Sequence, residues 1–224
     1  PERKGIMLGN FFTAVGSLFQ FLFQRKVLPQ TAAVFEALAE SITPLPGNPV
    51  SAGSERDKYA AAYYIYTLDH YVSLKVCFKP STFGLANAAA KMLNMAAKQL
   101  IDSGKNEHPA DSAFASAHGM FAALHTKDRC RVISLLEHLQ VDLAGLPVPF
   151  YKNPGTVLAV VSILTMLGSA GHYSEWTGYG ATRSGPPAAR KLVQFPAGWQ
   201  QVGYPGPAKG YHDLRGCLRD KFSE

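Results

Sequence analysis

The chain has 224 residues, with 22 Lys and Arg against 16 Asp and Glu, which gives a formal net charge of +6. Hydrophobic residues make up 47% of the chain and charged residues only 17%, a balance that excludes a disordered protein. A chain of this length suits one globular domain that buries a core without disulfides. The low charge predicts that part of the surface contacts a partner.

Helical periodicity dominates the first three quarters of the chain. Proline ends two of the expected helices, at Pro29 and in the proline-rich turn 44–49. Ser54, followed by acidic residues, is typical of a helix N-cap. No alternating segment of useful length predicts a strand, so we expect an all-α fold, an irregular multi-helix bundle. The expected helices are 5–28, 30–43, 55–77, 84–103, 110–124, 126–140 and 154–176.

Two stretches, 5–24 and 153–174, lack charge over nearly the length that crosses a bilayer. In the first, polar residues at 3-4-3-4 spacing draw a stripe along a helix, which favours packing against protein. In the second, four aliphatic residues follow i, i+3, i+4, i+7 spacing and predict a buried core helix: Val157, Val160, Val161 and Leu164. Neither stretch is interpreted as a transmembrane span.

Glycine and proline recur every few residues from residue 178 onward, which disfavours regular structure. Aromatic residues are nevertheless spread through this segment, and a disordered tail normally lacks them. We therefore expect residues 178–224 to lie extended across a surface, each ring filling a pocket. That surface is either the helical body, residues 1–177, or a partner subunit. The rings are Tyr179, Phe195, Trp199, Tyr204 and Tyr211.

Residues for chemistry are few. Cys77, Cys130 and Cys217 are too far apart for a zinc site or a disulfide framework, and we interpret them as small buried hydrophobic residues. His172 and Glu175 share a helix face, but a di-iron centre needs two such pairs, so they predict a capping or interface pair. No nucleophile, dinucleotide or phosphate-binding motif occurs. The sequence therefore predicts no catalytic, cofactor-binding or metal-binding residues in this chain, and a metalloenzyme using His172 and Glu175 is the least favoured alternative.

Four polar-tipped rings, Tyr59, Tyr63, Tyr66 and His70, fall on one face of the expected third helix. Such rings often lie at the edge of a core with satisfied hydroxyls. The alternative is a pocket for a small apolar or sugar ligand, in a free-standing ligand-binding protein. The basic residues are scattered and make no stripe, which argues against nucleic acid and favours an acidic patch on a protein partner.

Three phrases carry a resemblance to a known family: 35–44 (FEALAESITP), 171–180 (GHYSEWTGYG) and 198–207 (GWQQVGYPGP). Together they resemble the gluconate 2-dehydrogenase subunit 3 family, the small subunit that accompanies a large flavoprotein, over about residues 31–211. The chain departs from the commoner pattern at 179–187, where YGATRSGPP replaces an acidic, Arg-containing phrase.

The resemblance implies a non-catalytic subunit that supports the folding and twin-arginine export of a flavin-dependent dehydrogenase of the glucose–methanol–choline type. The partner would hold FAD and the catalytic His, with a cytochrome c subunit as a further candidate partner. A periplasmic location follows from the resemblance alone, because the printed sequence has no twin-arginine motif, so a cytoplasmic location stays open. Buried aromatic residues dominate many interfaces, and the expected anchors are Trp176, Tyr179, Trp199, Tyr204 and Pro205.

Overall fold

The computed structural model describes residues 28–43, 55–72 and 84–206, and within these ranges the fold is all-α with no strand. The expected helix 5–28 lies outside the described residues except for its last residue, and the turn 44–49 and the cap Ser54 also lie outside them. The α-helices are α2 (Pro29–Ile42), α3 (Glu55–His70), α4 (Leu85–Asp102), α5 (Ser112–His118), α6 (Met120–Ala123), α7 (Thr126–Glu137), α8 (Pro154–Tyr173) and α9 (Ala197–Gln201). Three short 3₁₀ helices complete the set: η1 (Leu143–Gly145), η2 (Glu175–Ser184) and η3 (Pro187–Ala189).

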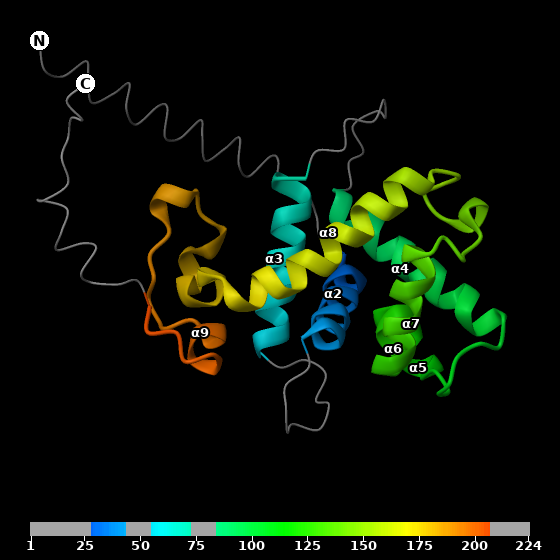
Figure 1. The fold of residues 1–224 in the computed structure, drawn as a ribbon, viewed down its shortest axis with the longest axis horizontal. Coiled ribbons are helices and arrows are strands. Elements are labelled where there is room, and N and C mark those ends of the chain that lie inside the picture. Colours follow the sequence, from blue (N-terminus) through cyan, green and yellow to red (C-terminus); the bar gives the residue numbers. More distant parts are fainter. Residues whose placement is uncertain (1–27, 44–54, 73–83, 207–224) are drawn as a thin grey trace, which may run out of the picture.

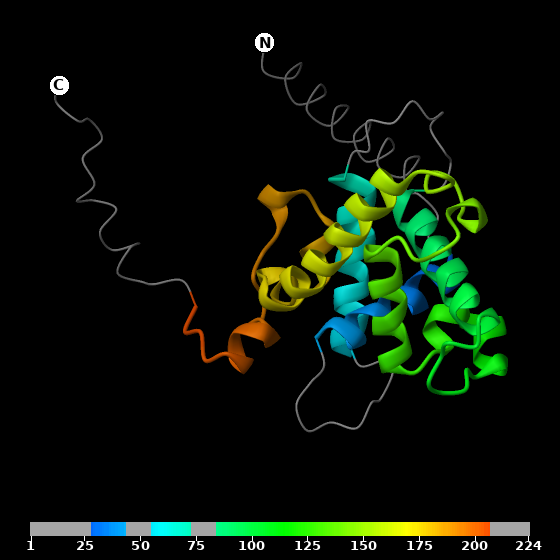
Figure 2. The same ribbon diagram turned by 45° about the vertical axis from the view of Figure 1, so that its right-hand side comes forward.

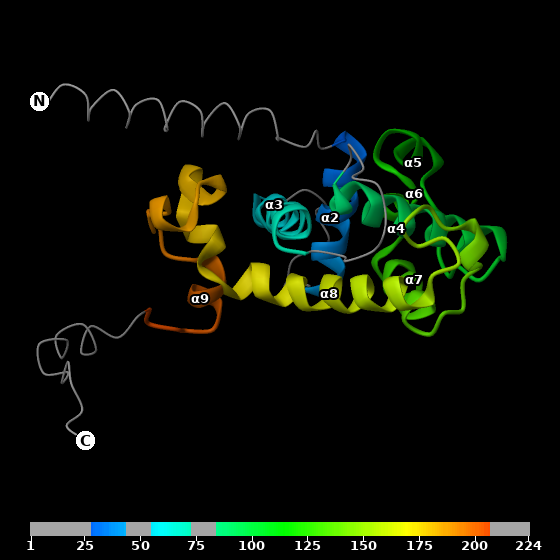
Figure 3. The same cartoon turned by 90° about the horizontal axis from the view of Figure 1, so that it is seen from above.

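The long helix α8 connects the two ends of the molecule. It contacts α2, α3 and α7 along its length and α9 and η2 at its carboxyl end. Seen from above, α8 runs past α2 and α3, with α4 to α7 at one end and α9 at the other (Figure 3). The segment after α8 therefore lies far from α4 to α7 (Figure 1, Figure 2).

Helix α2 occupies the centre of the core, in contact with α3, α4, α6, α7 and α8. Its apolar face is fully buried, and the Phe35 ring stacks on Tyr64 of α3 at 5.3 Å between ring centroids. Gly168 allows α8 to approach this pair, because a Cβ there would lie 2.6 Å from the Tyr64 hydroxyl. The burial of this face is the main stabilising contribution of α2.

The face of α8 whose apolar spacing predicted a core helix is buried, as expected: Val157, Val160, Val161 and Leu164 are at most 2% exposed. The opposite side is open, with Met166 62% exposed. By length and composition alone α8 could cross a membrane, and 44% of its most apolar window is buried within the protein. One side of α8 thus belongs to the core, and the other presents uncharged residues at the surface.

The expected helix 110–124 is wrong as a single element. The chain breaks at Gly119, whose φ of 96° ends α5 and starts α6. The Asn94 side chain accepts a hydrogen bond from the Phe121 N–H at 2.9 Å, and a Cβ on Gly119 would lie 2.7 Å from the Asn94 amide. A positive φ of this kind favours glycine, and the nearby Asn94 side chain leaves no room for a Cβ at this position.

The expectation that the segment after residue 177 lacks regular structure is also wrong, because η2, η3 and α9 lie within or extend into 178–206. Glycine and proline shorten these helices to a few turns without abolishing them. Ser174 caps η2 by accepting a hydrogen bond from the Trp176 N–H, and Gly180 bends η2 with a φ of 51°. Over its described residues this segment packs on the chain's own α3 and α8.

Candidate functional site

Trp176 joins the two regions that the sequence singled out separately, the tyrosine face of α3 and the aromatic tail. Its indole N–H donates a hydrogen bond to the Tyr59 carbonyl at 2.9 Å. Its ring meets Tyr63 edge-on at 5.3 Å, and Tyr66 lies 5.4 Å away on the same side. Trp176 is therefore only 3% exposed. One of the predicted interface anchors, Trp176, therefore packs directly on the predicted ligand face.

Two arginines of the tail fasten it to the same tyrosine face. The Arg183 guanidinium lies 3.9 Å from the centre of the Tyr59 ring. The Arg190 guanidinium donates through Nη2 to the Tyr66 hydroxyl at 2.9 Å and lies 5.5 Å from the Trp176 ring. Stacking of a guanidinium on a ring is favourable. Sequence reasoning missed both arginines, since nothing in their spacing connects them to α3.

Helix α9 is anchored at the carboxyl end of α8. The Trp199 indole donates to the Tyr173 carbonyl at 3.0 Å, and Trp199 is 8% exposed. His172 Nε2 lies 2.6 Å from Gln201 Oε1, a hydrogen bond between α8 and α9. Gly198 lies so close that a Cβ would come within 2.2 Å of the His172 carbonyl oxygen. These contacts fix α9 against α8.

A surface pocket of about 360 Å³, which we call the aromatic cavity, lies between α3, the end of α8, η2 and α9 and is largely open to solvent. This volume suits a small molecule. Both tryptophans of the chain line it. Its walls are mostly aromatic, with one cation and one carboxylate among them: Tyr63, Tyr173, Ser174, Glu175, Trp176, Tyr179, Arg190 and Trp199.

Glu175 and Tyr179 form a hydrogen-bonded pair in this cavity. The Tyr179 hydroxyl donates to Glu175 Oε2 at 2.5 Å. This hydrogen bond, then burial and the Glu175 charge, raise the pKa of Tyr179, and the Arg190 charge opposes them in part. The phenol therefore keeps its proton at neutral pH and engages one oxygen of Glu175, which also lines the cavity.

The four rings of the predicted ligand face have different environments. Only Tyr63 lines the cavity. Tyr59 lies under Arg183, and Tyr66 is bonded to Arg190. His70 is exposed at the end of α3, where its ring stacks on Tyr66 at 4.4 Å. The pocket is thus formed mainly by residues between positions 173 and 199, from the end of α8 to α9, with one ring from the predicted face.

The predicted partner anchors divide into two groups. Trp176 and Trp199 are buried within the chain, and Tyr179 lines the cavity. Tyr204 is 43% exposed and meets Trp199 edge-on at 4.9 Å, and Pro205 is exposed beside it. Their role in binding a partner stays a prediction. Five large apolar residues between positions 192 and 204 are each at least 43% exposed, and we call this set the tail patch: Leu192, Val193, Phe195, Val202 and Tyr204.

His172 and Glu175 each have a partner in the protein, Gln201 and Tyr179 respectively. Among the described residues no three His, Cys, Asp or Glu side chains are grouped so that they could hold a metal ion. The prediction of a buried Cys130 is wrong: Cys130 is exposed on α7, with its thiol 3.8 Å from the Ser41 carbonyl oxygen. Cys77 and Cys217 lie outside the described residues.

A second cleft, of about 370 Å³, lies at the opposite end of the molecule, beside α5, α6 and α7. The stacked rings of His108 and His125, 4.0 Å apart, stand at its wall. Arg129 also lines it, but its charge is already paired with Glu40. The aromatic cavity therefore offers the richer set of recognition groups.

The aromatic cavity combines groups that can bind a ligand. Rings supply flat apolar walls, Arg190 supplies positive charge, and Glu175 supplies negative charge.

Comparison of the chain with protein-family models, with curated proteins and with solved structures finds no match.

Proposed function

We propose that the chain is a non-catalytic small subunit that stabilises and matures a flavin-dependent sugar or polyol dehydrogenase. The observation that carries this proposal is the tail patch, an exposed apolar surface at one end of an otherwise helical body. Exposed apolar residues that gather on one surface are typical of a protein interface, and these five come from one short segment of the chain. The nature of the partner comes from the three phrases that resemble the gluconate 2-dehydrogenase subunit 3 family.

The tail patch is held in place by the buried rings beneath it. The N–H groups of Val193 and Gln194 both donate to the Gly178 carbonyl, at 2.9 and 3.2 Å. The Phe195 ring meets Trp199 edge-on at 5.7 Å. A surface that is ordered before binding loses less conformational entropy on association. Trp199 would thus support an interface through Phe195 and Tyr204 without reaching the partner itself.

Positive charge borders the tail patch. Arg183, Arg190 and Lys191 all lie on this end of the molecule, and the two arginines stack on rings. A partner with an acidic rim around an apolar centre would complement this arrangement, and such charges increase the rate of encounter. The expected contact is therefore apolar at its centre and salt-sensitive at its edge.

Co-expression tests the proposal. The chain is produced with its neighbouring open reading frame, and size exclusion is followed by absorbance near 450 nm, where flavin absorbs. We expect co-elution with a yellow partner, and loss of co-elution in the Val193→Asp/Phe195→Asp double variant. Met95→Glu, at an exposed apolar position on α4 away from the tail patch, is the control and should leave the complex intact. A chain that elutes apart from the co-expressed protein and without absorbance near 450 nm would overturn the proposal.

The aromatic cavity favours a second candidate function, a free-standing small-ligand-binding protein. The specific observation is a cavity of about 360 Å³ lined by both tryptophans and by opposite charges. Native mass spectrometry of the chain purified from its own host tests this function. An added mass that dissociates on activation supports it, and a bare chain that also fails to take up small metabolites from an extract contradicts it.

A further inference from the structure

We infer that the aromatic cavity binds a small zwitterion, of the size and kind of a free α-amino acid. This inference deepens the second candidate function and rests on it, and it does not depend on the subunit proposal. The carrying observation is that Arg190 and Glu175 line the same cavity, together with rings on the remaining walls. The ligand's carboxylate would meet Arg190, and its ammonium would meet Glu175.

Arg190 lines the cavity with its guanidinium held by two hydrogen bonds. Its Nε donates to the Gly185 carbonyl at 3.0 Å and its Nη2 to the Tyr66 hydroxyl at 2.9 Å, so the guanidinium plane is fixed. Within the described part of the chain no carboxylate pairs with it, since the ion pairs there involve His108, Arg129 and Arg131. The guanidinium has five N–H donors, so it keeps donors for a ligand carboxylate beyond those that Gly185 and the hydroxyls of Tyr66 and Tyr71 engage.

Glu175 provides the opposite end of the site. One of its oxygens, Oε2, accepts the Tyr179 hydroxyl, which holds the carboxylate in one orientation. The rings of Tyr63, Trp176 and Trp199 line the same cavity. An ammonium group gains both from the carboxylate and from the faces of such rings. Cation recognition thus uses groups that the protein's own hydrogen bonds already position.

The charges of the cavity select against ligands that carry a single charge. An anion on Arg190 would lie in the same pocket as the Glu175 carboxylate, and a cation on Glu175 would lie in the same pocket as the Arg190 guanidinium. Charges of like sign at such short range repel each other. A zwitterion satisfies both groups at once and brings no net charge into the site. The volume of about 360 Å³ accommodates the body of an amino acid such as leucine.

Intrinsic fluorescence gives a direct test, because the chain has only two tryptophans and both line the cavity. The probes are L-leucine and two analogues that each lack one of its charged groups: isoamylamine, without the carboxylate, and 4-methylpentanoate, without the ammonium. None of the three absorbs in the indole band. We expect a saturable change in tryptophan fluorescence with L-leucine at millimolar or lower concentration. Each singly charged analogue should bind at least about tenfold more weakly, a difference in binding free energy of about 1.4 kcal/mol or more. Singly charged analogues that bind as tightly as L-leucine would overturn the inference.

Charge-removing variants locate the binding site. Arg190→Gln and Glu175→Gln should each weaken L-leucine binding by about tenfold or more. The control is Arg183→Gln, since Arg183 stacks on Tyr59 and does not line the cavity; its affinity should stay within about threefold of the parent chain. Glucose serves as a neutral probe. Saturation by glucose but not by L-leucine would reject the zwitterion and keep the ligand-binding function, and no response to any probe would reject both.

Discussion

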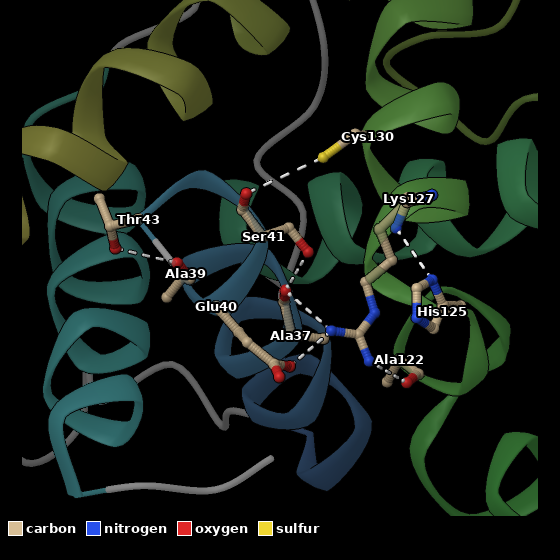
Figure 4. A network of polar contacts seen from close by, with 10 residues as sticks. Ala37, Ala39, Glu40, Ser41, Thr43, Ala122, His125, Lys127 and Cys130 are labelled. Carbon is tan, nitrogen blue, oxygen red and sulfur yellow. Dashed lines mark hydrogen bonds and ion pairs between the residues drawn. The ribbon is translucent and has the colours of Figure 1, made fainter. Parts of the chain in front are cut away.

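Arg129 Nη1 lies 2.6 Å from Glu40 Oε2, and this ion pair joins α7 to α2 inside the protein (Figure 4). The two side chains are 7% and 11% exposed. Nη1 also contacts the Ala37 carbonyl at 3.3 Å, and Nη2 donates to the Ala122 carbonyl at 2.9 Å. One guanidinium therefore connects α2, α6 and α7, and its loss would leave a buried carboxylate without a counter-charge.

The Arg129→Met variant should lower the free energy of unfolding by about 3–5 kcal/mol, because Glu40 would remain buried and unpaired. Urea denaturation of the purified chain measures this change. The matched control is Arg131→Met on the same helix, which breaks the exposed pair with Glu107 at 3.1 Å. That control should cost no more than about 1 kcal/mol. Equal losses of unfolding free energy in the two variants would show that the buried ion pair stabilises the protein no more than the exposed pair does.

Local sequence signals predicted several helices closely. The expected ranges 84–103 and 126–140 correspond to α4 (Leu85–Asp102) and α7 (Thr126–Glu137). Proline, glycine and apolar spacing act within a few residues of the chain, so they can be recognised without the fold. Gly119 was missed because the contact that requires glycine there comes from Asn94, on another helix. A contact between elements leaves no local pattern.

The candidate site shows the same limit more strongly. The sequence predicted that Tyr63 and Tyr66 share one helix face, which the structure shows, and it gave Trp176 only as an expected interface anchor at the end of another helix. It could not bring them together, since the hydrogen bond from Arg190 to Tyr66 spans 124 positions. Helical spacing shows which residues share a face, but not which segment covers that face. The cavity, its arginine and its charge balance therefore emerge only from the structure.

The Gly119→Ala variant should destabilise the α5–α6 junction. The alanine would adopt a left-handed φ of 96°, and its Cβ would lie 2.7 Å from the Asn94 amide that accepts the Phe121 N–H. Strain of this kind costs about 1–3 kcal/mol, which should lower Tm by several degrees. Gly155→Ala is the control, since its nearest contact is at an ordinary 3.8 Å. An unchanged Tm in Gly119→Ala would contradict the assigned backbone.

The Gly198→Ala variant should release α9 from the end of α8. A Cβ at this position would lie 2.2 Å from the His172 carbonyl oxygen, which is backbone and cannot move aside alone. The hydrogen bonds from Trp199 to Tyr173 and between His172 and Gln201 would then break. We expect a red shift of tryptophan emission and faster proteolysis after α8, with the rest of the fold retained. Emission identical to that of Gly155→Ala would argue against this packing.

Asp128 should make stability depend on pH in the acid range. It is 1% exposed and accepts hydrogen bonds from the backbone N–H groups of Glu107 at 2.8 Å and His108 at 3.0 Å. Burial by itself raises the pKa of this carboxyl, but the two N–H groups, together with the His108 side chain, outweigh burial and hold the pKa below 3.8. A depressed pKa gives stability that is fully present above about pH 4 and is lost as the pH falls further.

The Asp128→Asn variant should therefore lose part of this acid sensitivity. At pH 7 it should be less stable than the parent chain by about 1–3 kcal/mol, because the amide offers only one accepting oxygen to two backbone donors. Below about pH 4 the difference should shrink, because protonation removes the same interaction from the parent chain. Urea denaturation at a series of pH values measures both curves, with Asp111→Asn, at the exposed cap of α5, as the control. Parallel curves for Asp128→Asn and the parent chain would show that Asp128 keeps the same pKa on unfolding.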